Sequence, residues 1–134
     1  MRSFENRVCV VTGAASGIGR GLSLALAERG AELAISDIDE GGLAETASEA
    51  EARGAKVFAE RLDVADRDAF AAHADRVATN FGRVNMVINN AGVAVAGNIA
   101  ELALEDLQWL MGINYWGVVH GSQVFLPHLE ASGE

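Results

Sequence analysis

Three glycines near the start of the chain lie where a predicted strand ends and a predicted helix begins, a place that suits an anion. Gly13, Gly17 and Gly19 lie in the stretch VTGAASGIGR, between a short apolar run and a segment with helical periodicity. A loop at a helix start can turn its backbone N–H groups and the positive helix end toward a pyrophosphate. We assign Gly13 to the turn out of the strand, Gly17 to close ligand approach and Gly19 to helix–sheet packing. The alternative is a tight strand-to-helix turn without a ligand.

An acidic residue, Asp37, lies at the distance from the loop at which a dinucleotide-binding fold places its ribose-binding carboxylate. Asp37 ends the stretch ELAISD and lies 18 positions after Gly19. The two hydroxyls of an unphosphorylated ribose can donate to this carboxylate, whereas a 2′-phosphate would be repelled by it. No basic residue follows at once in DIDEGG, and Ser16 within the loop is neutral. The charge pattern therefore favours NAD over NADP, and we interpret Asp39 as the cap of the next helix.

Amide side chains occur at two further places that suit a binding site. Asn89 and Asn90 follow the apolar run MVI, and open α/β sheets bind ligands at the carboxyl ends of such strands. Asn114 lies in a largely apolar helical stretch, where an amide must find hydrogen-bond partners. The alternatives are a polar loop for the asparagine pair and a hydrogen-bonded core amide for Asn114.

The elements that must position these residues alternate along the chain. We expect strands at residues 7–12, 31–36, 56–62 and 84–90, helices at 17–29, 39–53 and 67–81, and a glycine-interrupted helical region at 104–130. In the first helix, an apolar stripe comprises Ile18, Leu22, Ala25 and Leu26. This alternation implies right-handed crossovers and a parallel sheet. The sequence predicts one α/β domain over residues 1–134.

The composition excludes several classes of partner. The chain of 134 residues has 19 acidic and 10 basic residues, a net charge of −9, and 50% hydrophobic residues. Such an acidic balance argues against nucleic-acid binding and against a basic membrane-binding face. No apolar run reaches the length of a membrane span, and we expect a cytoplasmic protein without a membrane partner.

Several residues receive structural rather than catalytic assignments. Cys9 lies in the apolar run VCVV and is expected to be a buried core residue, because one thiol forms neither an internal disulfide nor a metal site. His73 falls in a charged helix and is expected at the surface. Trp109, Tyr115 and Trp116 are expected to be core or interface aromatics. No spacing of histidines or acidic residues predicts a metal site.

Four motifs together resemble the N-terminal half of the short-chain dehydrogenase/reductase family. They are TGAASGIG at residues 12–19, LDV at 62–64, NNAG at 89–92 and INYWG at 113–117. The resemblance extends over essentially the whole chain. It implies a Rossmann-type, doubly wound parallel sheet with the strand order 3-2-1-4 and an NAD(P)-dependent oxidoreductase.

The same resemblance implies roles for individual residues. Asp63 and Val64 would flank the adenine, and Asn114 would be the catalytic asparagine that organises a water or proton path. The full set of implied cofactor-binding residues is Gly13, Ser16, Gly17, Ile18, Gly19, Asp37, Asp63, Val64, Asn90, Ala91 and Gly92. The substrate of the complete enzyme would be a small alcohol or carbonyl compound.

The family's tyrosine and its lysine four residues later have no counterpart in the chain. The chain contains one tyrosine, Tyr115, and one lysine, Lys56, which lie 59 positions apart in the reverse order. We therefore expect a cofactor-binding half that is inactive alone. Loss of the fifth strand would expose the edge of the fourth, so we also expect a homo-oligomer. The alternatives are a non-catalytic NAD-binding module and a truncated fragment that only self-associates.

Overall fold

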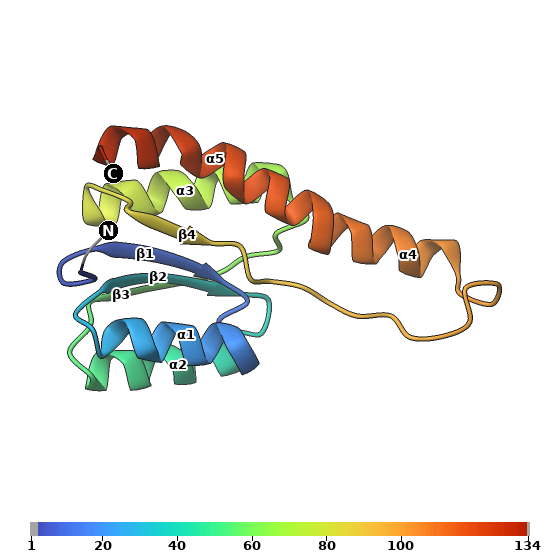
Figure 1. Ribbon diagram of the computed structural model, residues 1–134, viewed down its shortest axis with the longest axis horizontal. Helices are drawn as coiled ribbons and strands as arrows, with labels where there is room; N and C mark the ends of the chain where they lie inside the picture. The colour runs from blue at the N-terminus through green and yellow to red at the C-terminus, as the bar shows by residue number, and fades with distance from the viewer. Residues whose placement is uncertain (1–2, 134) are drawn as a thin grey trace.

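Four short strands pair in parallel in the computed structural model, which describes residues 3–133 (Figure 1). They are β1 (Val8–Thr12), β2 (Glu32–Asp37), β3 (Val57–Arg61) and β4 (Met86–Ile88). Their order in the sheet is β3-β2-β1-β4. Val10 of β1 pairs with Ala34 of β2 on one side and with Val87 of β4 on the other. The predicted α/β class and strand order are confirmed.

The central strand β1 is buried on both faces. Each residue of VCVVT is buried, with Val8 and Val10 in one apolar cluster and Cys9 and Val11 in the other. Successive side chains of a strand point to opposite faces, so a fully apolar strand requires cover on both sides. Cys9 is a core residue as predicted, and burial raises the pKa of its thiol to about 11.

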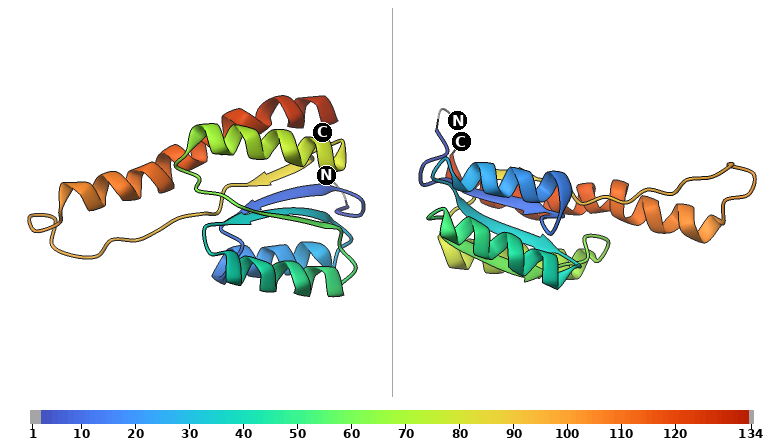
Figure 2. Two further views of the ribbon diagram at one scale, coloured as in Figure 1. Left: turned by 180° about the vertical axis from the view of Figure 1, so that it is seen from behind. Right: turned by 90° about the horizontal axis from the view of Figure 1, so that it is seen from below.

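Helices form a layer on each face of this sheet (Figures 1 and 2). One layer contains α1 (Gly17–Ala27) and α2 (Glu40–Ala52), and the other contains α3 (Arg67–Phe81) and α5 (Gly117–Ser132). Asp39 and Asp66 cap α2 and α3, since their side chains accept from the backbone N–H groups of Gly42 and Ala69. The cap at Asp39 agrees with the prediction from sequence.

The face of α1 that contacts the sheet differs from the predicted stripe. The buried residues of α1 are Gly19, Ser23, Leu26 and Ala27. Leu26 is buried as predicted, whereas Ile18 is 76% exposed, so its place in the predicted stripe is wrong. At the start of α1 the inner face holds Gly19, where a Cβ would overlap the Gly13 carbonyl oxygen.

The last helical region is a single run interrupted by one wider turn. It comprises α4 (Leu104–Met111), the π-helical turn η1 (Gly112–Trp116) and α5. Small residues let α5 lie close to its neighbours: a Cβ on Gly117 would come within 2.7 Å of Val64, and one on Gly121 would meet Asn89 and Phe70. The segment after β4 and helix α4 extend away from the sheet (Figures 1 and 2).

His73 is buried, which contradicts its predicted surface position. Its ring lies among Phe58, Phe70 and Phe125, and its Nδ1 is 2.7 Å from Glu60 Oε2. The charged residues around it in the sequence occupy the outer face of α3, and they conceal the inward position of His73. Sequence composition alone could not separate these two faces.

The buried imidazole of His73 is neutral. Burial lowers the pKa of His73, and this effect outweighs the opposing effect of the Glu60 carboxylate. Nδ1–H donates to Glu60, while the buried Nε2 has no hydrogen-bond partner among the described residues. Burial acts to raise the pKa of Glu60, but hydrogen bonds from Arg76 and His73 lower it overall.

We predict that this histidine destabilises the fold in mild acid. The pKa of His73 is lower in the folded state than in the unfolded one. Protonation therefore does not reduce the free energy of unfolding above pH 6.5, and it reduces it increasingly as pH falls below 6.5. The free energy of unfolding should fall by up to about 1.4 kcal/mol per pH unit in this range. Urea unfolding between pH 7.5 and 5.5 measures the slope.

The control for this prediction replaces the titrating ring without removing a donor. His73→Gln should lose most of the slope, whereas His128→Gln should retain it. Equal slopes in wild type and His73→Gln would contradict the assignment.

Candidate functional site

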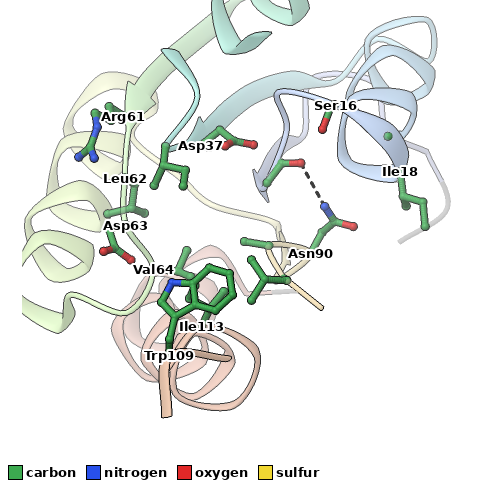
Figure 3. Close-up of a pocket in the computed structure, with 16 residues that line it drawn as sticks. Ser16, Ile18, Asp37, Arg61, Leu62, Asp63, Val64, Asn90, Trp109 and Ile113 are labelled. Atoms are coloured by element: carbon green, nitrogen blue, oxygen red, sulfur yellow. Dashed lines mark hydrogen bonds between the residues drawn. The ribbon is translucent and has the colours of Figure 1, made fainter. Parts of the chain in front are cut away.

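A cavity of about 480 Å³ lies at the carboxyl ends of the strands. Its walls come from the glycine loop after β1, the ends of β2 and β3, the segment after β4, and the α4–η1 helix (Figure 3). The chain leaves the sheet in opposite directions after β1 and β4, and open α/β sheets bind ligands at such a switch point. All eleven predicted cofactor-binding residues except Gly19 line the cavity.

The three glycines of the loop have different surroundings. Gly13 has φ +68°, and a Cβ there would lie 2.8 Å from Ala91 Cα. A Cβ on Gly19 would overlap the Gly13 carbonyl and lie 2.6 Å from Asn90 Nδ2. Gly17 has φ +54°, and a Cβ added there would have no other atom within 4 Å, so its open side faces the cavity that it lines. Gly19 therefore packs on the loop and on Asn90 rather than on the sheet.

The start of α1 presents free backbone donors to this cavity. Ser16 is the N-cap residue, its side chain makes no capping hydrogen bond, and it is exposed beside Ile18. The first N–H groups of a helix lack internal partners and carry the positive end of its dipole. The nearby cation, Arg20, is paired with Glu45 and Glu49 of α2. An anion at the loop would therefore be met by backbone N–H groups.

Asp37 is fixed beside the same loop. Its Oδ2 accepts from the backbone N–H of Ala15 at 3.0 Å, and its Oδ1 accepts from that of Asp39 at 3.0 Å. Each carboxylate oxygen has a second lone pair, so the ionised group can still accept hydrogen bonds from a ligand in the cavity. The structure thus brings the predicted carboxylate and glycine loop together.

The ends of β1 and β4 are joined by four hydrogen bonds. Thr12 Oγ1 accepts from the backbone N–H groups of Asn90 and Ala91, both at 3.1 Å. In return, Asn90 Nδ2 donates to the carbonyl oxygen of Thr12 at 3.0 Å. It also donates to the carbonyl oxygen of Gly13 at 3.2 Å (Figure 3). Sequence reasoning assigned no role to Thr12. A buried hydroxyl at the end of an apolar strand is the signal that could have identified it.

The end of β3 forms the opposite wall. Val64 is buried, and its carbonyl oxygen accepts from His120 Nδ1 at 3.1 Å, which ties this wall to α5. Asp63 is exposed, and its Oδ1 accepts from the backbone N–H of Ala65 at 3.0 Å. Arg61 adds a cation to the cavity lining that sequence reasoning did not name.

Asn114 lies in the π-helical turn and anchors the segment after β4. Its Nδ2 donates to the carbonyl oxygen of Val93 at 2.7 Å, and its Oδ1 accepts from the Val93 N–H at 2.8 Å. A Cβ on Gly92 would lie 3.3 Å from Asn114 Oδ1, so glycine suits the close approach. Asn114 thus has both polar atoms paired with one backbone unit, and its role in a proton path stays a prediction.

The expected aromatic residues are not in the core. Trp109 is 52% exposed and lines the cavity together with Ile113, one helical turn later. Tyr115 and Trp116 are also about half exposed and pack edge-on against each other. Of the two predicted alternatives, core or interface, the core position is excluded for all three, and the interface position stays a prediction.

Neither a membrane-spanning helix nor a cluster of metal ligands occurs within residues 3–133. No helix in this range is long and apolar enough to cross a membrane. No group of three or more histidine, cysteine, aspartate or glutamate side chains in it could hold a metal ion.

The sequence is similar to those of known oxidoreductases. A sequence model described as short chain dehydrogenase matches residues 7–134. SadH of Mycobacterium tuberculosis, named as an oxidoreductase, is 52% identical over 134 residues, which are 100% of this chain and 49% of SadH.

Some solved structures with the same fold are complexes with NAD or with 5-hydroxy-NADP. A short chain dehydrogenase/reductase from Burkholderia phymatum in complex with NAD has a TM-score of 0.96 and 40% identity, covering 100% of this chain and 48% of that chain. An alcohol dehydrogenase from Thermococcus sibiricus complexed with 5-hydroxy-NADP has a TM-score of 0.91 and 32% identity, and the match covers 95% of this chain and 55% of that chain. The chain thus spans about half the length of these relatives.

We predict that the hydroxyl of Thr12 stabilises the cavity floor. Thr12→Val keeps the shape of the side chain but removes the acceptor for the N–H groups of Asn90 and Ala91. The free energy of unfolding should fall by about 1–3 kcal/mol, because the partly buried N–H of Ala91 loses its acceptor, whereas the N–H of Asn90 keeps the Ile88 carbonyl at 2.9 Å. Urea unfolding measures this loss. Thr12→Ser retains the hydroxyl and should lose less, and equal stability of the two variants would refute the role.

Proposed function

Since this chain belongs to the short-chain dehydrogenase family, we propose that it binds NAD and serves hydride transfer to or from a small alcohol or carbonyl compound. The observation that carries the proposal is one cavity with the open face of Gly17 on one side and the fixed carboxylate of Asp37 beside it. Gly17 lets a pyrophosphate approach the N-terminus of α1, and Asp37 accepts from ribose hydroxyls.

The charge at the ribose position supports NAD over NADP. Asp37 is the acidic group next to the loop, and a 2′-phosphate placed there would face its negative charge. Among the relatives, the Burkholderia structure contains NAD and the Thermococcus structure contains 5-hydroxy-NADP, so family membership alone does not decide. Arg61 favours the second candidate, NADP, because it pairs with Asp37 in the sheet register and lines the cavity. In Figure 3, however, its guanidinium group points away from Asp37.

The remaining residues of the cavity have positioning roles in this proposal. When bound, NAD supplies the group that accepts or donates the hydride. Asn90 holds the glycine loop, and Asn114 holds Val93 at the end of the cavity through two hydrogen bonds. If the side-chain amide of Asn114 changed its hydrogen-bond partner from Val93 to a water molecule, it could carry out the predicted proton-path role.

Self-association and a cytoplasmic location also form part of the proposal. Met111, Tyr115, Val118 and Leu126 are exposed apolar residues that recur at helical spacing along α4, η1 and α5. An apolar stripe of this kind supports a homo-oligomer. The single cysteine is buried, which suits a reducing compartment.

We predict that the carboxylate of Asp37 sets cofactor selectivity. Asp37→Asn retains one acceptor oxygen but removes the charge, so the affinity ratio of NAD to NADP should fall about tenfold. Isothermal titration calorimetry with each cofactor measures this ratio. Asp39→Asn removes a charge two residues away outside the cavity and should leave the ratio unchanged. An unaltered ratio in Asp37→Asn would refute the assignment.

We predict that residues 1–134 alone bind NAD without oxidising alcohols. No Tyr-x-x-x-Lys pair is present in the sequence, and the side chain of Lys56 is bound to the carbonyl of Asn80 and lies over Phe81. Spectrophotometric assay of NADH formation with an alcohol panel should give no turnover. Turnover that disappears in Asn114→Ala would contradict this prediction.

A further inference from the structure

We infer that the indole of Trp109 is a stacking surface for the adenine ring, an inference that rests on the proposed NAD site. Trp109 lies in α4, is 52% exposed and lines the cavity. Figure 3 shows its ring reaching into the cavity from the helix, near Val64 and Ile113. No sequence motif singled out this position.

The location of Trp109 corresponds to the adenosine end of the cavity. The glycine loop would hold the pyrophosphate, and Asp37 at the end of β2 would hold the adenosine ribose. The base attached to that ribose then lies toward β3, whose end supplies Asp63 and Val64. Trp109 belongs to this side, whereas Ser16 and Ile18 lie on the opposite side in Figure 3.

The indole of Trp109 contacts no other aromatic ring among the described residues. Within residues 3–133, no aromatic ring contacts it and no acceptor pairs with its Nε1–H. Trp116 is a useful contrast, because it is 51% exposed yet packs edge-on against Tyr115 and also contacts the His120 ring. The half-exposed face of Trp109 instead borders the cavity, where a flat base could cover it.

Hydrogen bonds on both sides fix the walls between which a base would lie. Asn114 binds Val93 and holds the π-helical turn next to α4. His120 donates to the carbonyl oxygen of Val64, so the wall at the end of β3 is tied to the same helical run. Ile113 adds an apolar side chain one turn after Trp109. An aromatic side chain that is already held in position loses little conformational entropy when a base stacks on it.

Fluorescence of the two tryptophans tests the inference directly. The chain contains only Trp109 and Trp116, so Trp116→Phe leaves Trp109 as the sole emitter and Trp109→Phe leaves Trp116. In Trp116→Phe, both NAD and adenosine monophosphate should quench the emission saturably, whereas nicotinamide mononucleotide should not. In Trp109→Phe, none of the three should quench it saturably.

Calorimetry on full-chain variants provides an independent readout. Trp109→Leu removes the flat ring and should weaken both NAD and adenosine monophosphate about tenfold. Trp109→Phe retains a ring and should bind within about threefold of wild type. Trp116→Leu is the matched control and should bind as wild type does. Circular dichroism checks that each variant is folded.

The outcomes separate this inference from the proposed function. Saturable NAD binding by wild type that is unchanged in Trp109→Leu, with no quenching of Trp109, would overturn the inference and leave the NAD site standing. Quenching of Trp109 by nicotinamide mononucleotide but not by adenosine monophosphate would place the indole at the other half of the cofactor and would also overturn it. Absence of NAD binding by wild type would overturn both.

Discussion

The hydrogen bonds between Thr12 and the Asn90–Ala91 backbone are the constraint on which the rest of the site depends. They join the centre of the sheet to β4, a strand of three residues with only one paired neighbour among the described strands. Asn90 completes the link by donating to the carbonyls at the start of the glycine loop. Gly13 and Gly19 then fit against this unit, where any Cβ would collide. These contacts therefore set the conformation of the loop. Of its three glycines, only Gly17 has no other atom within 4 Å of an added Cβ.

The functional surfaces extend from that unit in two directions. Toward β2, the Ala15 N–H donates to Asp37, so the carboxylate is hydrogen-bonded to the glycine loop. Toward the helical layer, Asn114 holds the chain that follows β4, and the same helical run supplies Trp109. A dinucleotide has a phosphate, a ribose and a base in that order along its length. The proposed site has the loop N–H groups, the Asp37 carboxylate and the Trp109 ring in the same spatial order along the cavity.

Much of the fold could be predicted because the decisive signals are local. The strand periodicity, the glycine loop and the cap at Asp39 each depend on a few neighbouring residues. The error at His73 arose because its environment is made by distant segments, since Phe58 and Phe125 enclose its ring. The position of Trp109 on the cavity was not predicted for the same reason, because the end of β3 lines that cavity too. Thr12 was missed for the same reason, since its partners are 78 and 79 positions away. The residues next to Thr12 in the sequence do not indicate which distant segment its side chain will contact.

The claim that this cavity binds NAD through the glycine loop is tested most directly by amide NMR. ¹H–¹⁵N spectra of the chain are recorded as NAD is added, and the shift of each backbone N–H is followed. Saturable shifts should appear at Gly17, Ile18 and Gly19 and at Asp39, whose N–H is bonded to Asp37. The outer residues of α3, far from the cavity, should not shift. Unchanged loop amides at saturating NAD, or shifts confined to other surfaces, would contradict the claim.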